Sequence, residues 1–176
     1  ERPQDTAALV VLSGASNPWP GGLGASYSVP NSSLGGRLAV PLVSALLSDK
    51  TLETMVDGVF TPQSAPAGYA DYIGASLALR RDSLRANARQ VTSLKPQLAQ
   101  MVPLYSDLPM PVEILHGEAD DTVPATIHAI PLSRQIPNAN LVLLPGIGHM
   151  PHHVAQADVA AAIDRAAARA GLHPTP

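Results

Sequence analysis

Two stretches in the second half of the chain decide the fold: Pro111–Pro124, which reads PVEILHGEADDTVP, and Leu141–Met150, which reads LVLLPGIGHM. Each is a short apolar run followed by a turn that contains glycine, and such a run is typical of a strand. The residues from Thr126 to Ile136 between them read as a helix, which Pro131 must begin or kink. A strand, helix, strand order predicts two neighbouring parallel strands joined by a right-handed crossover. The fold class is therefore α/β.

A carboxylate and an imidazole follow these two strands. Asp120 lies in the first turn and His149 in the second. Both turns leave the carboxyl edge of the predicted sheet, where open α/β sheets hold their sites, so we expect the two side chains to lie within hydrogen-bond distance. A carboxylate beside a histidine selects one tautomer and stabilises the imidazolium that forms when the ring removes a proton from a nucleophile. The sequence thus predicts an acid and base pair.

At these residues the chain resembles the α/β-hydrolase family, whose last strands carry a G-x-x-D-x-x-V-P turn and then a G-x-G-H turn. The matching residues are Gly117, Asp120, Val123 and Pro124 in the first turn and Gly146, Gly148 and His149 in the second. The resemblance implies a partial α/β-hydrolase fold, with parallel strands, flanking helices and a mostly helical lid. It also implies that Asp120 and His149 are the acid and base of a serine hydrolase acting on a small ester or related acyl compound without a cofactor.

The G-x-S-x-G nucleophile elbow of that family does not occur in the sequence. The nearest imitation is GASLA at Gly74–Ala78, but the preceding Ala67–Ile73 is a poor strand, so Ser76 is a weak candidate nucleophile. The family's early strands and its oxyanion-hole loop have no counterpart either. We therefore expect a companion chain or segment to carry the nucleophile elbow.

The resemblance also suggests three parts. Residues 1–16 are expected to hold the first sheet strand, Ala7–Leu12, whose continuous apolar run AALVVL predicts burial on both faces. Residues 17–108 are expected to form a helical lid without a strand of the main sheet, because prolines and glycines punctuate them. Residues 109–176 are expected to form the C-terminal core with both turns.

Helical periodicity supports this division. Within the lid, Tyr69–Leu79 is expected to begin a helical stretch, and Leu84–Leu98 carries apolar residues at helical spacing. The tail from Gln156 to Ala170 is rich in alanine and ends before Gly171, which favours a final helix. Arg165 and Arg169 lie near its end, where the helix dipole favours cations.

Composition excludes several functions. With 45% hydrophobic and 14% charged residues among 176, the chain is globular rather than disordered. Only 3% of the residues are aromatic and the net charge is −3, which argues against nucleic-acid binding. The absence of cysteine excludes disulfides, thiol nucleophiles and cysteine-ligated metals. No apolar run reaches the roughly 18 residues of a membrane span.

Several residues have competing interpretations. Asp121 is the alternative acid, but the G-x-x-D spacing favours Asp120. His152 and His153 would need His149 and a further ligand to hold a metal, and nothing at ligand spacing supplies one, so we predict no metal site.

Other residues are assigned structural roles. Arg81, Arg85 and Arg89 are expected to form a solvated helix face rather than a phosphate site. Trp19 is expected to pack the lid onto the sheet, with a place in the substrate pocket as the alternative. His116 is expected to be buried rather than catalytic.

Two other functions stay open at this stage. One alternative to a serine hydrolase is a catalytically silent binding or regulatory partner. The other is a different reaction on the same fold, such as that of a dehalogenase, an epoxide hydrolase, a lyase or a peroxidase. The missing elbow residue would separate the reactions. The sequence determines neither the substrate-binding residues nor the compartment.

Overall fold

The computed structural model describes residues 3–22 and 48–172. Its contacts divide the chain into two units. The first, here called the sheet unit, comprises Glu1–Pro18, Val59–Gln63 and Leu98–Pro176. The second, here called the helical unit, comprises Trp19–Gly58 and Ser64–Gln97.

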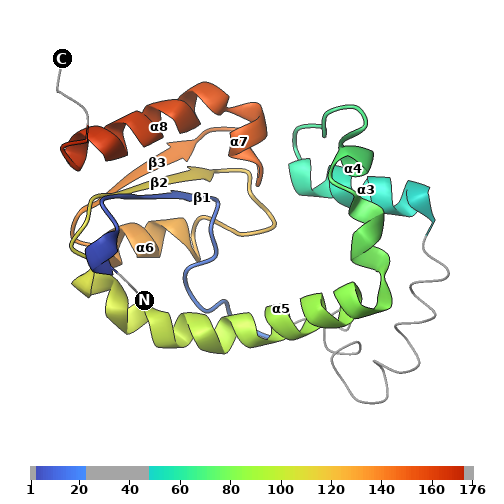
Figure 1. The fold of residues 1–176 in the computed structure, drawn as a ribbon, viewed down its shortest axis with the longest axis horizontal. Coiled ribbons are helices and arrows are strands. Elements are labelled where there is room, and N and C mark those ends of the chain that lie inside the picture. The colour runs from blue at the N-terminus through green and yellow to red at the C-terminus, as the bar shows by residue number, and fades with distance from the viewer. Residues whose placement is uncertain (1–2, 23–47, 173–176) are drawn as a thin grey trace. The chain divides into compact units, whose positions relative to one another are not determined.

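Three parallel strands form the sheet, in the order β1 (Leu9–Leu12), β2 (Val112–Gly117) and β3 (Ala139–Leu144) (Figure 1). Leu12 lies opposite Leu115, and Gly117 lies opposite Leu144. The crossover from β2 to β3 contains α6 (Ala129–Gln135), with Pro131 in its first turn. The predicted parallel pairing of the last two strands is confirmed, and both turns leave the same edge.

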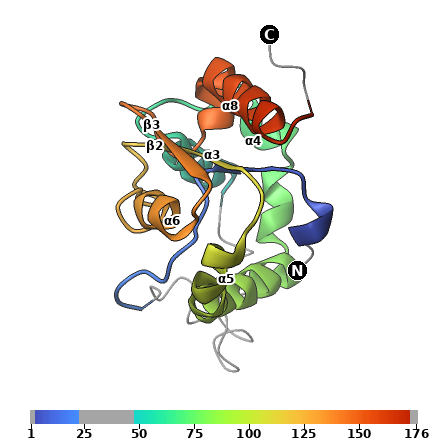
Figure 2. The same ribbon diagram turned by 90° about the vertical axis from the view of Figure 1, so that its left-hand side faces the viewer.

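One helix covers each face of the sheet: α6 on one side and α8 (Gln156–Arg169) on the other (Figure 2). Strand alternation sends Val112 and Ile114 toward α6, whereas Leu115 packs with Ala162 of α8. All six residues of β2 are buried, so β2 is the centre of the core. The predicted final helix is confirmed, and Gly171 follows it with a φ of 71°.

The expectation that the first strand is buried on both faces is wrong. β1 begins at Leu9 rather than Ala7, and Leu9 is 38% exposed. Among the described strands β1 pairs only with β2, so one edge of it is unpaired. The apolar side chains of β1 are therefore only partly covered, because among the described strands β1 has a neighbour on one side.

A buried carboxylate on β2 joins the sheet to α8. Glu113 is fully buried and accepts hydrogen bonds from Arg169 at 2.7 Å, Arg165 at 3.1 Å and Asn140 at 2.8 Å. Arg169 also donates to the carbonyl oxygens of Val112 and Asn138. The two arginines therefore hold α8 against the sheet, a role that the dipole argument from sequence did not foresee.

Burial alone would raise the pKa of Glu113, but the bonds from Asn140, Arg169 and Arg165 outweigh it and hold the pKa below its ordinary value. A lowered pKa means that the unfolded chain binds the proton more readily than the folded chain. The stability that Glu113 contributes is therefore complete above the pKa that it has in the unfolded chain. It is lost as the pH falls through the pKa that it has in the folded chain.

A second polar cluster ties the segment after β1 to the start of α6. The ring Nδ1 of buried His128 accepts hydrogen bonds from the backbone N–H groups of Ser16 and Asn17, both at 3.2 Å. The Ser16 hydroxyl donates to the His128 carbonyl oxygen at 3.0 Å, and the Tyr105 hydroxyl donates to the Ser16 carbonyl oxygen at 2.8 Å. Because Nδ1 accepts, the ring is neutral with its proton on Nε2.

The helical unit contains α4 (Tyr69–Tyr72), a 3₁₀-helix (Ala75–Leu79) and most of α3 (Asp49–Phe60) and α5 (Arg81–Met101). The predicted amphipathic helix is confirmed by α5. Tyr69–Leu79 begins the helical stretch as expected, but in two pieces, because Gly74 has a φ of 62° and separates α4 from the 3₁₀-helix.

Two other expectations concern the lid region. Across residues 17–22 and 48–108, the part of it that the structure describes, there is no strand; residues 23–47 lie outside the described residues. Trp19 lies under the Lys95 ammonium at 5.9 Å, and its packing on the sheet stays a prediction.

No helix in the described ranges has the length and hydropathy for a membrane span.

Replacing Arg169 by methionine is expected to lower the free energy of unfolding by about 2 kcal/mol, because buried Glu113 would lose one of its two cationic partners. Urea unfolding measures this loss. Arg89→Met, an exposed control on α5, should change it by less than about 0.5 kcal/mol. Equal losses in the two variants would contradict the structural role of Arg169.

Stability is also expected to fall below a pH of about 6.5 because of His128, whose pKa is lowered by burial and by His116, against the opposing charge of Asp120. The folded chain favours the neutral ring, so stability is present above the unfolded pKa and is lost as the pH drops below it. His128→Asn keeps an acceptor in place of Nδ1 but does not titrate. Urea unfolding at pH 7.0, 6.0 and 5.5 should show a smaller decrease in the free energy of unfolding in this variant than in the original chain. The same dependence on pH in both would refute the role of His128.

Candidate active site

Asp120 is held by the turn that follows β2. The side chain is buried, and Oδ1 accepts hydrogen bonds from the backbone N–H groups of Thr122 at 3.0 Å and Val123 at 2.8 Å. Burial by itself would raise its pKa, but the bonds from His116, His149 and the Val123 N–H outweigh burial and hold the pKa well below its ordinary value. Asp120 is therefore a charged carboxylate at neutral pH.

His149 lies in the turn that follows β3 and meets Asp120. Its Nδ1 is 2.9 Å from Oδ2 of Asp120, so the predicted proximity is confirmed. A carboxylate only accepts, so Nδ1 carries the proton and Nε2 of the neutral ring holds the lone pair. The side chain is 23% exposed, and within the described residues Nε2 has no hydrogen-bond partner. The ring is arranged to take a proton at Nε2.

Two glycines allow other backbone segments to approach the histidine turn closely: Gly117 admits the acid turn and Gly148 admits the segment at Thr61. A Cβ on Gly117 would overlap the carbonyl oxygens of Ile147 and Gly148, and a Cβ on Gly148 would overlap the carbonyl oxygen of Thr61. The backbones are joined where the Ala119 N–H donates to the Ile147 carbonyl oxygen at 2.9 Å. Gly117 and Gly148 are therefore required by backbone contact, whereas Gly146 is required by its positive φ of 70°.

His116 is buried beneath the pair, as expected. Its Nε2 is 2.6 Å from the Val123 carbonyl oxygen and 3.2 Å from Oδ2 of Asp120. A carbonyl oxygen only accepts, so Nε2 carries the proton and is shared between both acceptors. Nδ1 of His116 is buried without a partner among the described groups. Two imidazoles thus share one carboxylate oxygen, and only His149 is open to solvent.

The other candidates are placed elsewhere. Asp121 is exposed and does not bond either histidine. Ser76 is exposed in the 3₁₀-helix after Gly74, not in a strand-to-helix turn. His152 and His153 lie in α7 (Pro151–Val154) with their ring centroids 4.4 Å apart. Within the described ranges no cluster of metal-ligating side chains is arranged to hold a metal ion.

The remaining side chains to place are the three arginines of α5 and Gln63. Arg81 and Arg89 are exposed, and Arg85 lies 3.7 Å from Asp82, which fits a solvated face. Gln63, which sequence reasoning missed, bonds the backbone on both sides of Ile147. A lone glutamine in a proline-containing loop carries no sequence signal for such a role.

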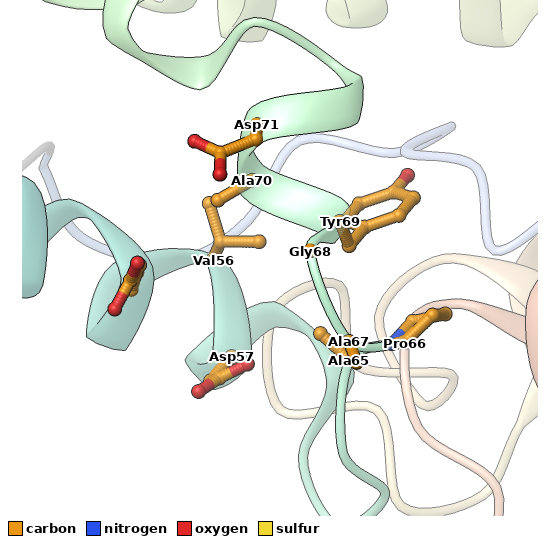
Figure 3. Close-up of a pocket in the computed structure, with 10 residues that line it drawn as sticks. Val56, Asp57, Ala65, Pro66, Ala67, Gly68, Tyr69, Ala70 and Asp71 are labelled. Atoms are coloured by element: carbon orange, nitrogen blue, oxygen red, sulfur yellow. The ribbon is translucent and has the colours of Figure 1, made fainter.

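A separate pocket of about 290 Å³ lies within the helical unit, between α3 and the residues that lead into α4 (Figure 3). Asp57 and Asp71 are on its walls with Tyr69 and Val56. Both carboxylates are solvent-exposed, so they keep their hydration and need no bound cation. We assign this pocket no role.

Comparison with known proteins identifies the fold. No protein-family model and no curated protein matches the sequence. Solved structures do match, among them a 2-hydroxy-6-oxo-6-phenylhexa-2,4-dienoate hydrolase from Rhodococcus sp. strain RHA1, with a TM-score of 0.63 and 14% identity over 89% of this chain and 55% of that one.

Two further matches are a malate-bound thermophilic esterase from Thermogutta terrifontis and a bromoperoxidase from Bacillus anthracis. The esterase has a TM-score of 0.52 and 18% identity over 93% of this chain and 56% of its own. The bromoperoxidase has a TM-score of 0.52 and 18% identity over 72% of this chain and 47% of its own. The chain thus spans about half the length of these enzymes.

At these identities the likeness shows the fold alone. The chain has part of the α/β-hydrolase fold, which confirms the resemblance and the fold class inferred from the two turns.

Gly148→Ala is expected to lower the free energy of unfolding by more than about 2 kcal/mol and to displace His149, because the new methyl group would overlap the Thr61 carbonyl oxygen. Gly58→Ala is the matched control: it lies inside α3 with open space around its Cβ, and it should stabilise by about 0.5 kcal/mol. Thermal and urea unfolding compare the variants. Similar behaviour of the two would show that the turn at Gly148 is not closely packed.

Proposed function

We propose that this chain supplies the acid, Asp120, and the base, His149, of a serine hydrolase that acts on a small ester or related acyl compound. The observation that carries the proposal is the 2.9 Å bond between Asp120 Oδ2 and His149 Nδ1, which leaves Nε2 as the proton acceptor. The low pKa of Asp120 supports it, because a charged carboxylate stabilises the imidazolium formed during the reaction.

The chemistry follows from these two groups. His149 Nε2 takes the proton of a serine hydroxyl as its oxygen attacks the acyl carbon, and gives that proton to the departing alkoxide as the ester C–O bond breaks. In the second half His149 takes a proton from water, whose oxygen attacks the acyl-serine, and returns it to the serine oxygen. Asp120 keeps Nδ1 protonated and the ring oriented throughout, and neither step needs a metal or another cofactor.

The serine and the oxyanion donors are proposed to come from a segment outside this sequence, either joined before Glu1 or on a companion polypeptide. Three observations favour such a segment. β1 has an unpaired edge among the described strands, and Leu9 on it is 38% exposed. An apolar pocket of about 400 Å³ lies beside Leu9, lined also by Leu104, Leu108 and Met110. The chain also spans only 55% and 56% of the hydrolase and esterase that it matches.

The isolated 176-residue chain is expected to show no ester turnover above buffer, because its sequence has no G-x-S-x-G motif to supply the proposed nucleophile. Adding the polypeptide encoded directly upstream of Glu1 should produce turnover of short acyl nitrophenyl esters. In that mixture, His149→Ala and Asp120→Asn should each lower kcat by about 10⁴-fold. Asp121→Asn, at an exposed position beside Asp120 that bonds neither histidine, is the control and should keep most of the activity.

Two outcomes would contradict parts of the proposal. Turnover by the isolated chain, confirmed by intact mass and lost in His149→Ala, would place the nucleophile inside this chain and refute the separate segment. If the mixture turns over ester and His149→Ala leaves the rate unchanged, His149 takes no part in the reaction.

A further inference from the structure

We propose that Gln63 is the positioning residue for His149: its carboxamide holds the histidine turn by bonding the backbone on both sides of Ile147. The inference rests on the proposed function for the role of His149, whereas the hold on the turn can be tested without any activity. Gln63 belongs to the sheet unit, so every group involved lies within one unit.

Both polar groups of the Gln63 carboxamide form hydrogen bonds with the backbone of the histidine turn. Nε2 of Gln63 donates to the carbonyl oxygen of Gly146 at 2.7 Å, and the N–H of Gly148 donates to Oε1 at 3.0 Å. A backbone carbonyl only accepts and a backbone N–H only donates, so a single orientation of the amide satisfies both. The side chain thus acts as a two-point clamp on the peptide groups that lead into His149.

Besides Gln63, two backbone hydrogen bonds hold the peptide groups of Ile147. The carbonyl oxygen of Ile147 accepts from the Ala119 N–H, and the Ile147 N–H donates to the Leu144 carbonyl oxygen at 3.3 Å. Gly148 is buried, so without Gln63 its N–H would have no partner among the described groups. The peptide of Gly148 sets the direction in which His149 leaves the backbone, and hence its distance from Asp120.

Gln63 is itself fixed by its neighbours. Phe60 is 1% exposed, with its ring centroid 5.5 Å from that of His153, and the Gln63 N–H donates to the Phe60 carbonyl oxygen at 2.8 Å. The Thr61 carbonyl lies so close to Gly148 that no side chain fits between them. The clamp therefore stands on a segment that is already packed against the turn, so little side-chain freedom is lost when it forms.

Amide and imidazole proton exchange in the ¹⁵N-labelled 176-residue chain tests the clamp. Gln63→Met fills similar space without either bond, and Gln100→Met, at an exposed position on α5, is the matched control. In Gln63→Met the amide of Gly148 and the Nδ1–H of His149 should exchange about tenfold faster or more, since two hydrogen bonds are lost. The amide of Leu115 in β2 should exchange at the original rate, and all three protons should do so in the control.

A second variant keeps the test decisive if Gln63→Met does not fold. Gln63→Glu retains an acceptor for the Gly148 N–H and loses the donor to the Gly146 carbonyl oxygen. The Gly148 amide should therefore stay protected from exchange, although the hydrogen bond to Gly146 is lost. Unchanged exchange in Gln63→Met, equal acceleration at Leu115, or loss of Gly148 protection in Gln63→Glu would each overturn the proposal.

Activity then separates this inference from the proposed function. In the mixture with the nucleophile segment, Gln63→Met should lower kcat about tenfold and leave KM within about twofold, since the clamp acts through His149 and not on substrate. If His149→Ala proves to have no effect on turnover, the proposed function fails, and the exchange experiment still decides whether Gln63 holds the turn. Faster exchange with unchanged kcat would refute the positioning role while the proposed function stands.

Discussion

The backbone contact between Gly117 and the peptide of Ile147 and Gly148 is the constraint on which the rest of the site depends. It exists because Gly117 carries no Cβ: a side chain at this position would overlap the carbonyl oxygens of Ile147 and Gly148. It brings the ends of β2 and β3 together closely enough for Asp120 and His149 to bond at 2.9 Å. The chemistry of the pair follows from a steric fact about the main chain.

Around that contact, the structure concentrates its polar interactions on β2. Glu113 on this strand binds Arg165 and Arg169 of α8, and His116 near its end donates to Val123 and Asp120. Buried charges are costly unless they are paired, so these groups restrict the helices and turns that contact β2 to one arrangement. The central strand thus positions both the covering helix and the acid turn.

The histidine turn is held differently. It has no buried charge of its own, and its support is hydrogen bonding from β3, from the acid turn and from Gln63, which lies on a segment far earlier in the chain. His149 is partly exposed, whereas Asp120 is buried. The base of such a pair must reach the substrate, whereas the acid needs to contact only the base. The difference in burial between His149 and Asp120 therefore matches their two proposed roles.

The sequence alone determined the parallel strand pair, the final helix and the meeting of Asp120 with His149, because each depends on local patterns: apolar runs, a helical period, and glycines at set positions in turns. It did not determine the break at Gly74, nor the exposure of β1, since burial depends on neighbouring elements and among the described strands β1 pairs only with β2. Only the tertiary structure decided that Glu113 would be buried between two arginines, that His128 would accept from Ser16 and Asn17, and that Gln63 would hold the histidine turn. These contacts join residues that are distant in the chain, and a single side chain carries no signal of a partner that folding alone brings to it.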